Sequence, residues 1–162
     1  MLVALISDTH LPRGRRALPA ACIERLRQAD LIVHAGDLTA IAVLDELRGY
    51  GEVRAVRGNA DDAQARARLP EQLELELDGA RVAVIHDGGR RAGRLQRLKR
   101  RFPGADAVVF GHSHMPLHET GEGGFQIFNP GSPTDKRGAP SATMGLARTT
   151  SRGLRFELVE LA

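Results

Sequence analysis

Short apolar runs alternate with amphipathic segments through the first two thirds of the chain, and this alternation constrains the fold more than any other feature. The apolar runs at residues 2–6, 31–33, 53–56, 82–85 and 107–110 are typical of strands buried on both faces. Between these runs, apolar residues with helical spacing mark segments 18–28, 41–50 and 92–102. The repeated strand-then-helix order predicts a mostly parallel sheet with helices packed on it.

Two regions depart from that order. Residues 72–77 alternate polar and apolar side chains, and the tight-turn dipeptide Asp78-Gly79 leads into a return strand at Arg81, which predicts a hairpin. After Met115 the glycines cluster, residues 125–128 resemble a short strand, and 143–148 with 154–161 resemble a final hairpin. This tail has no helical pattern and predicts a second, more antiparallel sheet. We therefore expect an α/β fold of two sheets packed face to face with helices outside, as a single domain over residues 1–162.

The composition excludes several classes of protein. Of 162 residues, 42% are hydrophobic and 27% are charged, which is typical of a globular chain rather than a disordered or fibrous one. Cys22 is the single cysteine, so an internal disulfide and a cysteine-rich zinc site are excluded, and we expect Cys22 in the core. No apolar run approaches the roughly 20 residues of a membrane span, and residues 1–7 lack the pattern of a signal peptide. We expect a soluble, cytoplasmic protein with no membrane partner.

The net charge of +3 is too small to indicate nucleic-acid binding by itself. The positive charge is concentrated in residues 90–101, which hold seven cations and no acid. One interpretation is the solvated face of a helix, with Leu95, Leu98 and Phe102 as its apolar stripe, and the other is a nearby anionic partner. We favour the solvated face, because almost all cations of this chain are arginine, with Lys99 and Lys136 the two lysines, which indicates compositional bias rather than a site. The chain also has one tyrosine, no tryptophan and five phenylalanines, and so offers few rings for base stacking on a nucleic acid.

Metal-ligating residue types follow five of the predicted strands. In chain order they are Asp8, His10, Asp37, Asn59, His86, His112 and His114. Because α/β sheets place ligand sites at the carboxyl ends of their strands, these residues should converge on one rim. Singly, each has a structural explanation: Asp37 could cap a helix, Asn59 could form a turn, and His86 could be a core histidine. Their occurrence at five strand ends together favours a metal site.

The donor set also indicates the metals. Two carboxylates, one amide and four imidazoles exceed what one ion can use, so we expect two divalent ions with one bridging group. Such donors without a thiolate suit manganese, iron, zinc, nickel or cobalt, and we expect manganese first. Two other histidines are assigned no ligand role. His34 is expected to support the loop after the second strand, and His118 to lie on the surface.

These motifs together resemble the calcineurin-like metallophosphoesterases. The set is Asp8-Thr9-His10, Gly36-Asp37, Gly58-Asn59, His86 and Gly111-His112-Ser113-His114. The short chain and Asn129-Pro130-Gly131-Ser132, expected to form a loop that shapes the site, resemble the small bacterial and archaeal phosphodiesterase branch.

The resemblance implies a four-layer α/β/β/α sandwich. It also implies a phosphodiesterase in which a hydroxide bridging two metal ions attacks a small-molecule phosphate ester. The implied ligands are Asp8, His10, Asp37 and His114 for the first ion, and Asp37, Asn59, His86 and His112 for the second, with Asp37 bridging.

Two positions depart from the family pattern. Many members continue Gly-Asn-His, and that histidine is taken to protonate the leaving group, whereas this chain has Ala60. We expect the next residue, Asp61, to face solvent and to be a poor acid. Where the family often has His-Gly-His, this chain has His86-Asp87-Gly88, which keeps only the ligand. General acid catalysis typically contributes 10²–10⁴-fold, so its loss indicates slower turnover or easier leaving groups.

Two alternatives to a small-molecule phosphodiesterase remain open. The first is a non-catalytic metal-binding or interaction scaffold on the same fold, and the complete set of seven ligand positions weighs against it. The second is a nucleic-acid substrate contacted by residues 90–101, which would show binding that weakens steeply with salt. A homo-oligomer is also open, because the antiparallel tail could offer an edge or a face to a second copy.

Overall fold

The chain is described over residues 1–161 by a computed structural model with two mixed β-sheets of five strands each. The first sheet contains β1 (Leu2–Ile6), β2 (Leu31–His34), β3 (Val53–Ala55), β9 (Ala142–Thr150) and β10 (Gly153–Leu161). Its strand order is β10-β9-β1-β2-β3. Strands β1, β2 and β3 are parallel, whereas β9 is antiparallel to both β1 and β10.

The second sheet is also mixed. It contains β4 (Gln72–Leu77), β5 (Ala80–Ile85), β6 (Ala107–Val109), β7 (Leu117–Thr120) and β8 (Gln126–Asn129). Its strand order is β4-β5-β6-β8-β7, with parallel pairing in the centre and antiparallel pairing at both edges. The hairpin predicted around Asp78-Gly79 is confirmed, since β4 and β5 pair antiparallel from Gln72 opposite Ile85 to Leu77 opposite Ala80.

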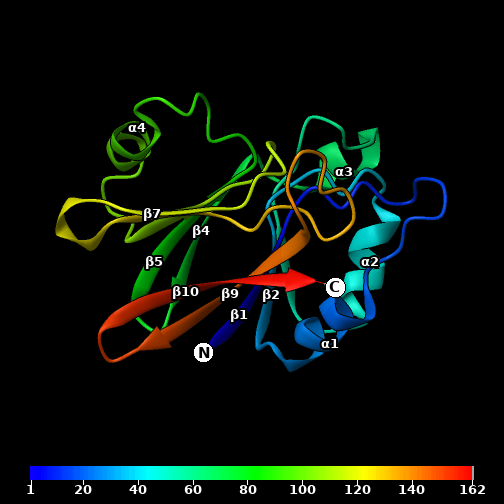
Figure 1. Cartoon of the computed structure of the whole chain (residues 1–162), viewed down its shortest axis with the longest axis horizontal. Coiled ribbons are helices and arrows are strands. Elements are labelled where there is room, and N and C mark those ends of the chain that lie inside the picture. Colours follow the sequence, from blue (N-terminus) through cyan, green and yellow to red (C-terminus); the bar gives the residue numbers. More distant parts are fainter. Residues whose placement is uncertain (162) are drawn as a thin grey trace.

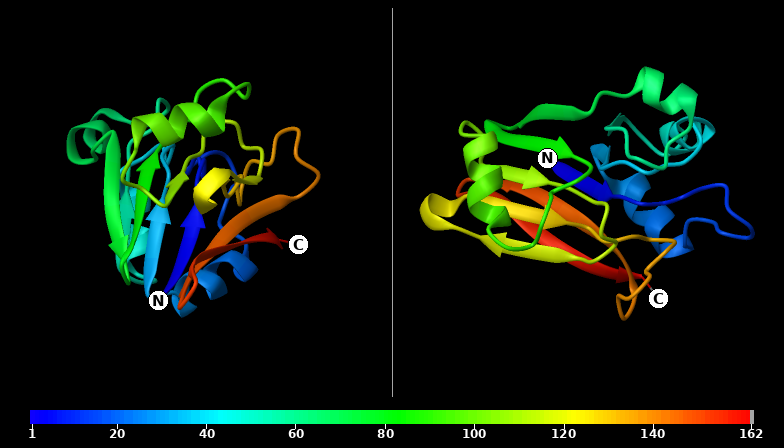
Figure 2. Two further views of the ribbon diagram at one scale, coloured as in Figure 1. Left: turned by 90° about the vertical axis from the view of Figure 1, so that its left-hand side faces the viewer. Right: turned by 90° about the horizontal axis from the view of Figure 1, so that it is seen from above.

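Helices cover the outer face of each sheet. They are α1 (Ala20–Gln28), α2 (Ala42–Arg48), α3 (Ala63–Arg68) and α4 (Arg94–Arg101), with a short 3₁₀ turn η1 (Glu122–Gly124). Helices α1 and α2 lie beyond the first sheet and α4 lies beyond the second (Figures 1 and 2). The expected α/β/β/α layering is therefore confirmed. None of the helices described over residues 1–161 is long and apolar enough to cross a membrane.

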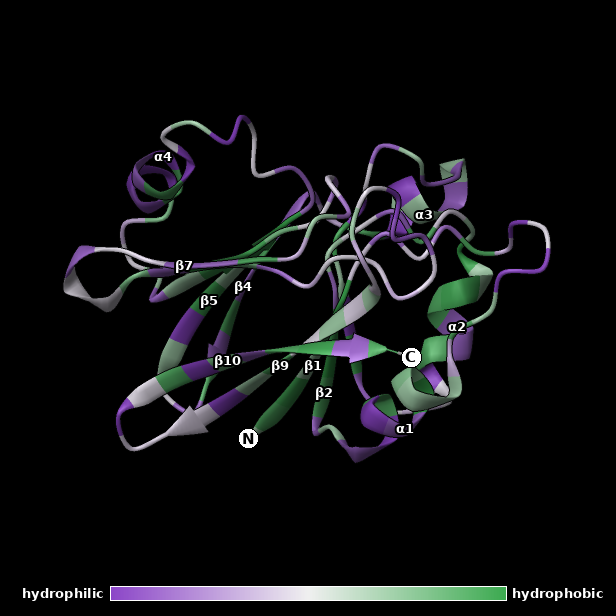
Figure 3. Ribbon diagram, viewed as in Figure 1, coloured by the Kyte–Doolittle hydropathy of each residue, from purple (hydrophilic) through white to green (hydrophobic). Residues whose placement is uncertain are grey.

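Three apolar layers follow from the period-two alternation of the strands. In β1, Val3 and Leu5 face the second sheet, whereas Ala4 and Ile6 face the helices. Cys22 of α1 is fully buried in that outer layer, as predicted. The third layer lies under α4, where Leu98 and Phe102 are buried, which confirms the predicted apolar stripe. Figure 3 shows the result, with α4 mostly hydrophilic on its outer side and α2 largely hydrophobic.

The expectation that the tail forms the second, more antiparallel sheet is correct for β7 and β8 and wrong for β9 and β10. The final hairpin, β9 and β10, joins the first sheet, because β9 pairs antiparallel with the open edge of β1. Strands β7 and β8 extend the second sheet instead, since β8 pairs parallel with β6. Strand β7 and helix α3 are elements that the sequence pattern did not predict. Helix α3 has six residues and depends on a cap, the Asp62 carboxylate accepting the Ala65 N–H at 2.7 Å.

Contact between the two sheets is close at Gly145 of β9. A Cβ there would overlap the ring of Phe128, which is fully buried on β8, and would crowd Leu5. We therefore expect Gly145→Ala to lower the free energy of unfolding by about 1–3 kcal/mol, because the added methyl forces the sheets or the ring to shift. Urea denaturation measures this change.

The matched control is Gly138→Ala, where an added Cβ meets no atom within 4 Å. Its free energy of unfolding should stay within about 0.5 kcal/mol of the wild type. Equal effects at both positions would contradict the close approach of the sheets.

Candidate metal centre

All seven predicted ligands lie at the carboxyl-end rim of the two sheets. Asp8 and His10 follow β1, Asp37 follows β2 and Asn59 follows β3, so these four come from the first sheet. The second sheet contributes the other three, His86 after β5 and His112 with His114 after β6. The convergence expected from the strand-end pattern is therefore confirmed. Their donor atoms form two groups, each close enough to hold a metal ion.

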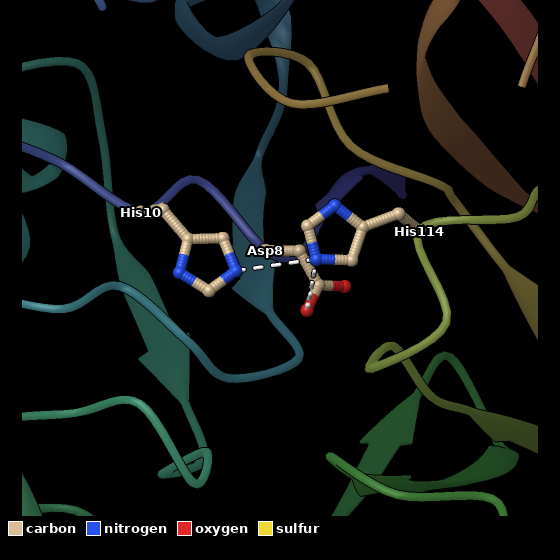
Figure 4. A group of neighbouring side chains, drawn as sticks. All are labelled: Asp8, His10 and His114. Atoms are coloured by element: carbon tan, nitrogen blue, oxygen red, sulfur yellow. Dashed lines mark hydrogen bonds and ion pairs between the residues drawn. The ribbon is translucent and has the colours of Figure 1, made fainter. Parts of the chain in front are cut away.

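The first group consists of Asp8, His10 and His114. The Nε2 atoms of His10 and His114 face each other at 3.2 Å, with the rings stacked at 5.1 Å between centroids (Figure 4). Asp8 Oδ1 lies 3.6 Å from His114 Nε2. All three residues are buried. Two ring nitrogens and a carboxylate oxygen aimed at one point are a donor set suited to a divalent transition metal.

The second group consists of Asp37, His86 and His112. Asp37 Oδ2 lies 3.3 Å from His86 Nε2. Asn59 joins this group through its side-chain oxygen, which is 3.1 Å from His86 Nε2 and 3.0 Å from His112 Nδ1. The amide oxygen, the carboxylate and both rings therefore share one small space.

Asp37 connects the two groups. Besides its contact with His86, its Oδ2 lies 3.6 Å from His10 Nε2 in the first group. Its other oxygen, Oδ1, accepts the backbone N–H of Ala60 at 2.7 Å. A carboxylate held in this way between two sets of imidazoles is placed to bridge two ions.

Surrounding groups fix the orientation of the rings. His86 Nδ1 donates to the Ala35 carbonyl at 2.8 Å, and His114 Nδ1 donates to the Asp135 carbonyl at 2.5 Å. A carbonyl can only accept, so both histidines carry a proton on Nδ1 and present Nε2 to the site. Ser7 Oγ donates to Asp8 Oδ2 at 2.7 Å and holds that carboxylate. Sequence reasoning missed Ser7 and Asp135, because hydroxyls and backbone carbonyls carry no ligand pattern.

The backbone at these ligands has a conformation that L-residues rarely adopt. Five of them lie in the left-handed region, with φ of 55° at Asp8, 46° at His10, 59° at Asp37, 70° at His112 and 58° at His114. Such conformations persist where the surrounding structure over-determines them, and they cluster at functional sites. Gly58 and Gly111 add to this close packing, because a Cβ at either would overlap the carboxylate of Asp37 or the Ser7 hydroxyl.

The pKa values of the two carboxyl groups are shifted in opposite directions. Burial raises the pKa of Asp8 to about 6, against the opposing effects of the His86 charge and the Ser7 hydrogen bond. Burial also acts to raise the pKa of Asp37, but the hydrogen bond and charge of His86, with the Ala60 amide, together lower it to about 2. Asp8 Oδ1 is buried and has no hydrogen-bond partner within the described chain. A bound cation would satisfy this oxygen, so the residues fit the metal ions that their types predict.

The expectation that Asp61 faces solvent is wrong. Only 1% of Asp61 is exposed, and its two oxygens accept the Thr39 N–H at 2.8 Å and the Gly58 N–H at 2.6 Å. These two amides belong to the loops that follow β2 and β3, so Asp61 fastens together the loops that carry Asp37 and Asn59. No sequence pattern indicates this role, because the partners of Asp61 are backbone groups.

Other expectations for this rim are confirmed. His34 is fully buried; its Nδ1 accepts the Gly36 N–H at 3.2 Å and its Nε2 donates to Thr9 Oγ1 at 3.0 Å, which supports the loop. Burial lowers the pKa of His34 to about 3, so the ring is neutral. His118 is exposed on β7. The loop from Asn129 to Ser132 borders the centre, since Ser132 Oγ donates to the Asp8 carbonyl at 2.8 Å.

Two arginines of the cationic segment 90–101 make specific contacts with the protein in addition to the predicted solvated face. Arg97 donates to the carbonyls of Gly88, Arg90 and Ala92 at 2.7–3.2 Å. Arg94 donates to the Gly89 carbonyl at 2.7 Å and lies over the Phe110 ring. These two arginines therefore hold the loop that directly follows His86.

A comparison with protein families identifies the chain. The calcineurin-like phosphoesterase superfamily domain matches residues 1–152. The protein therefore belongs to the calcineurin-like phosphoesterases, as the motifs predicted, and this family uses divalent metals.

Its relatives are small proteins of the same class. The chain is 37% identical over 139 residues to a probable metallophosphoesterase of Methanothermobacter thermautotrophicus, covering 85% of this chain and 80% of the relative. It is 38% identical over 141 residues to a probable metallophosphoesterase of Methanocaldococcus jannaschii, covering 85% and 70%. Among solved structures, Vps29 from Entamoeba histolytica complexed with zinc shares the fold, with a TM-score of 0.76, 24% identity and full coverage of both chains. A novel archaeal phosphodiesterase shares it too, with a TM-score of 0.73, 20% identity, and coverage of 98% and 100%.

The role of Asp61 is tested by Asp61→Asn. Asparagine has one accepting oxygen, so one of the two loop amides would face an NH₂ group and lose its partner. We expect a loss of about 1–3 kcal/mol in the free energy of unfolding, measured by urea denaturation. Asp45→Asn is the control, because Asp45 is exposed and its carboxylate pairs with exposed Arg48, and the substitution should change stability by about 1 kcal/mol or less. A neutral Asp61→Asn variant would contradict the fastening role.

Metal affinity should depend on the protonation of Asp8. Below a pKa of about 6 the carboxyl is protonated, and an ion must displace that proton, so affinity is lost as the pH falls. His86 acts in the same direction: burial opposes its protonation, but its hydrogen bond and ion pair with Asp37 raise its pKa. Titration calorimetry with Mn²⁺ should show affinity at least about tenfold weaker at pH 5 than at pH 7. Equal affinity at both values would contradict this account.

Proposed function

We propose that this protein is a metal-dependent phosphodiesterase that holds two divalent ions, manganese first among them. The first ion would be held by Asp8, His10, Asp37 and His114, and the second by Asp37, Asn59, His86 and His112. The observation that carries the proposal is the position of the Asp37 carboxylate, with Oδ2 within 3.6 Å of a ring nitrogen from each group. The archaeal phosphodiesterase of the same fold supports diesters as substrates.

The chain's own residues position the reaction. Two divalent ions bound here supply a hydroxide nucleophile and positive charge for the phosphate oxygens. Carbonyl contacts at His86 and His114 keep their Nε2 atoms directed at the ions, so no ring must reorient during turnover. Asp37 remains ionised at neutral pH, because its pKa is about 2. The left-handed ligand backbones keep this geometry fixed before substrate arrives.

Within residues 1–161, neither of the two residues that follow Asn59 is suited to protonate a leaving group. Ala60 offers only a methyl group, and its N–H is used by Asp37. Asp61 is buried and both of its oxygens accept loop amides, so its carboxyl group has a structural role away from solvent. We infer that solvent supplies the proton, and that the enzyme favours diesters with acidic leaving groups such as nitrophenols.

A non-catalytic scaffold is the second candidate, because the Vps29 structures share this fold. The buried Asp8 Oδ1 without a hydrogen-bond partner in the described chain weighs against a scaffold that binds no metal. A scaffold that does bind metal would use the same ligands, so the activity test below separates it from the enzyme. The family membership also favours hydrolysis of phosphate esters.

Activity on a chromogenic diester tests the proposal. Metal-stripped protein should be inactive on bis(p-nitrophenyl) phosphate, and added Mn²⁺ should restore hydrolysis that exceeds the rate on p-nitrophenyl phosphate. Inactivity with Mn²⁺, Ni²⁺, Co²⁺ and Zn²⁺, in protein shown by calorimetry to bind two ions, would overturn the enzyme and favour the scaffold.

Asp37→Asn tests the bridging carboxylate. Loss of its charge removes a shared ligand, so kcat/KM with Mn²⁺ should fall by at least about 100-fold, and calorimetry should show fewer ions bound. His118→Asn is the control, because His118 is an exposed histidine outside the centre. Full activity of Asp37→Asn with two ions bound would show that Asp37 does not bridge.

A further inference from the structure

A hollow of about 430 Å³ opens beside the second group of ligands. Asn59, His86 and His112 form the side nearest the centre. The remaining lining residues are Arg57, Gly58, Glu71, Ile85, Asp87 and Arg101. The volume falls within the roughly 300–1,000 Å³ of small-molecule sites and exceeds what a bare phosphate needs. A group attached to phosphorus therefore has room on this side of the centre.

The charged residues of this wall are fixed by contacts of their own. Arg57 forms an ion pair with Glu71 and donates through Nη1 to the Arg66 carbonyl at 2.9 Å. Asp87 Oδ1 accepts the Gly89 N–H at 2.7 Å. Arg101 donates through Nη2 to Gln72 Oε1 at 3.1 Å, which leaves other guanidinium donors for a ligand. Groups held in place lose less entropy when they bind a ligand.

The residues that line the hollow carry equal numbers of positive and negative side chains and little apolar surface. Two guanidinium groups face two carboxylates, so a further anionic group on the substrate would meet Glu71 and Asp87. Ile85 is the single apolar side chain among the lining residues. The lining has no Phe, Tyr or Trp on which a nucleobase could stack, and its two rings, His86 and His112, belong to the proposed ligand set. Hydroxyl groups can both donate to the carboxylates and accept from the guanidinium groups.

We propose that this hollow binds one substituent of the phosphodiester and selects an uncharged, hydroxyl-bearing group, a polyol or a sugar. Arg101 is the specificity-determining residue, because its guanidinium stacks over the Phe102 ring and donates to the neutral side-chain oxygen of Gln72, which leaves further N–H groups to donate to a hydroxyl oxygen. This inference rests on the proposed function, since a phosphate at the metal centre directs the substituent into the hollow.

Binding of matched phosphomonoesters tests the inference. Glycerol 3-phosphate and n-propyl phosphate have the same carbon chain and differ by two hydroxyl groups. By calorimetry with Mn²⁺-loaded protein, glycerol 3-phosphate should bind about tenfold more tightly. It should also bind more tightly than phenyl phosphate, which is aromatic, and 3-phosphoglycerate, which adds a carboxylate. Equal binding of the first pair, or tighter binding of either of the other two, would overturn the inference.

Arg101→Ala should reduce the preference for glycerol 3-phosphate over n-propyl phosphate at least threefold. Arg100→Ala is the matched control, because Arg100 is the preceding exposed residue of α4 and does not line the hollow. It should keep the preference unchanged, and equal effects of the two variants would overturn the role of Arg101.

Hydrolysis of bis(p-nitrophenyl) phosphate by the same preparations separates the two proposals. Hydrolysis without any preference for the hydroxyl-bearing ligand overturns the inference and leaves the proposed function standing. A preference that Arg101→Ala abolishes, in protein that does not hydrolyse the diester, overturns the proposed function and supports the hollow as a binding site.

Discussion

The packing of the two sheets against each other is the constraint on which the metal centre depends. Each group of ligands draws from both sheets, so neither sheet by itself presents a site. Asp8 and His10 of the first sheet meet His114 of the second, and Asp37 meets His86 and His112. The close contact at Gly145 and Phe128 therefore matters for the metal centre as well as for stability. It sets the distance between the two halves of every proposed coordination sphere.

Burial of charge is the second constraint, and it explains why the rim is held so tightly. A carboxyl group whose pKa is raised to about 6, with one oxygen lacking a partner, costs free energy in the metal-free protein. The left-handed backbones at the two carboxylates and at His10, His112 and His114 add strain. Asp61 and the arginines of α4 oppose these costs, because Asp61 fastens two loops to each other and Arg97 fastens the loop after His86 to α4. The ligand residues themselves are therefore strained, whereas the residues that surround them are well hydrogen-bonded.

The sequence predicted the layers and the ligand set, because both follow from local patterns. Apolar runs marked the central strands, and metal-binding residue types after each run marked the rim. What it could not predict depends on long-range backbone contacts. The pairing of β9 with β1 was missed because strand pairing leaves no local signal. The burial of Asp61 was missed for a related reason, since its partners are the amides of Thr39 and Gly58 and not side chains.

The division of ligands between the sheets also has a thermodynamic consequence. An ion that binds only when both sheets are docked stabilises the docked state by mass action, in proportion to the logarithm of its concentration over its dissociation constant. The unfavourable state of Asp8 is relieved at the same moment, because the ion replaces its proton and satisfies Oδ1. Metal binding and sheet packing therefore reinforce each other in this fold. Bound ions would offset the strain at the rim, and the proposed reaction requires the same ions.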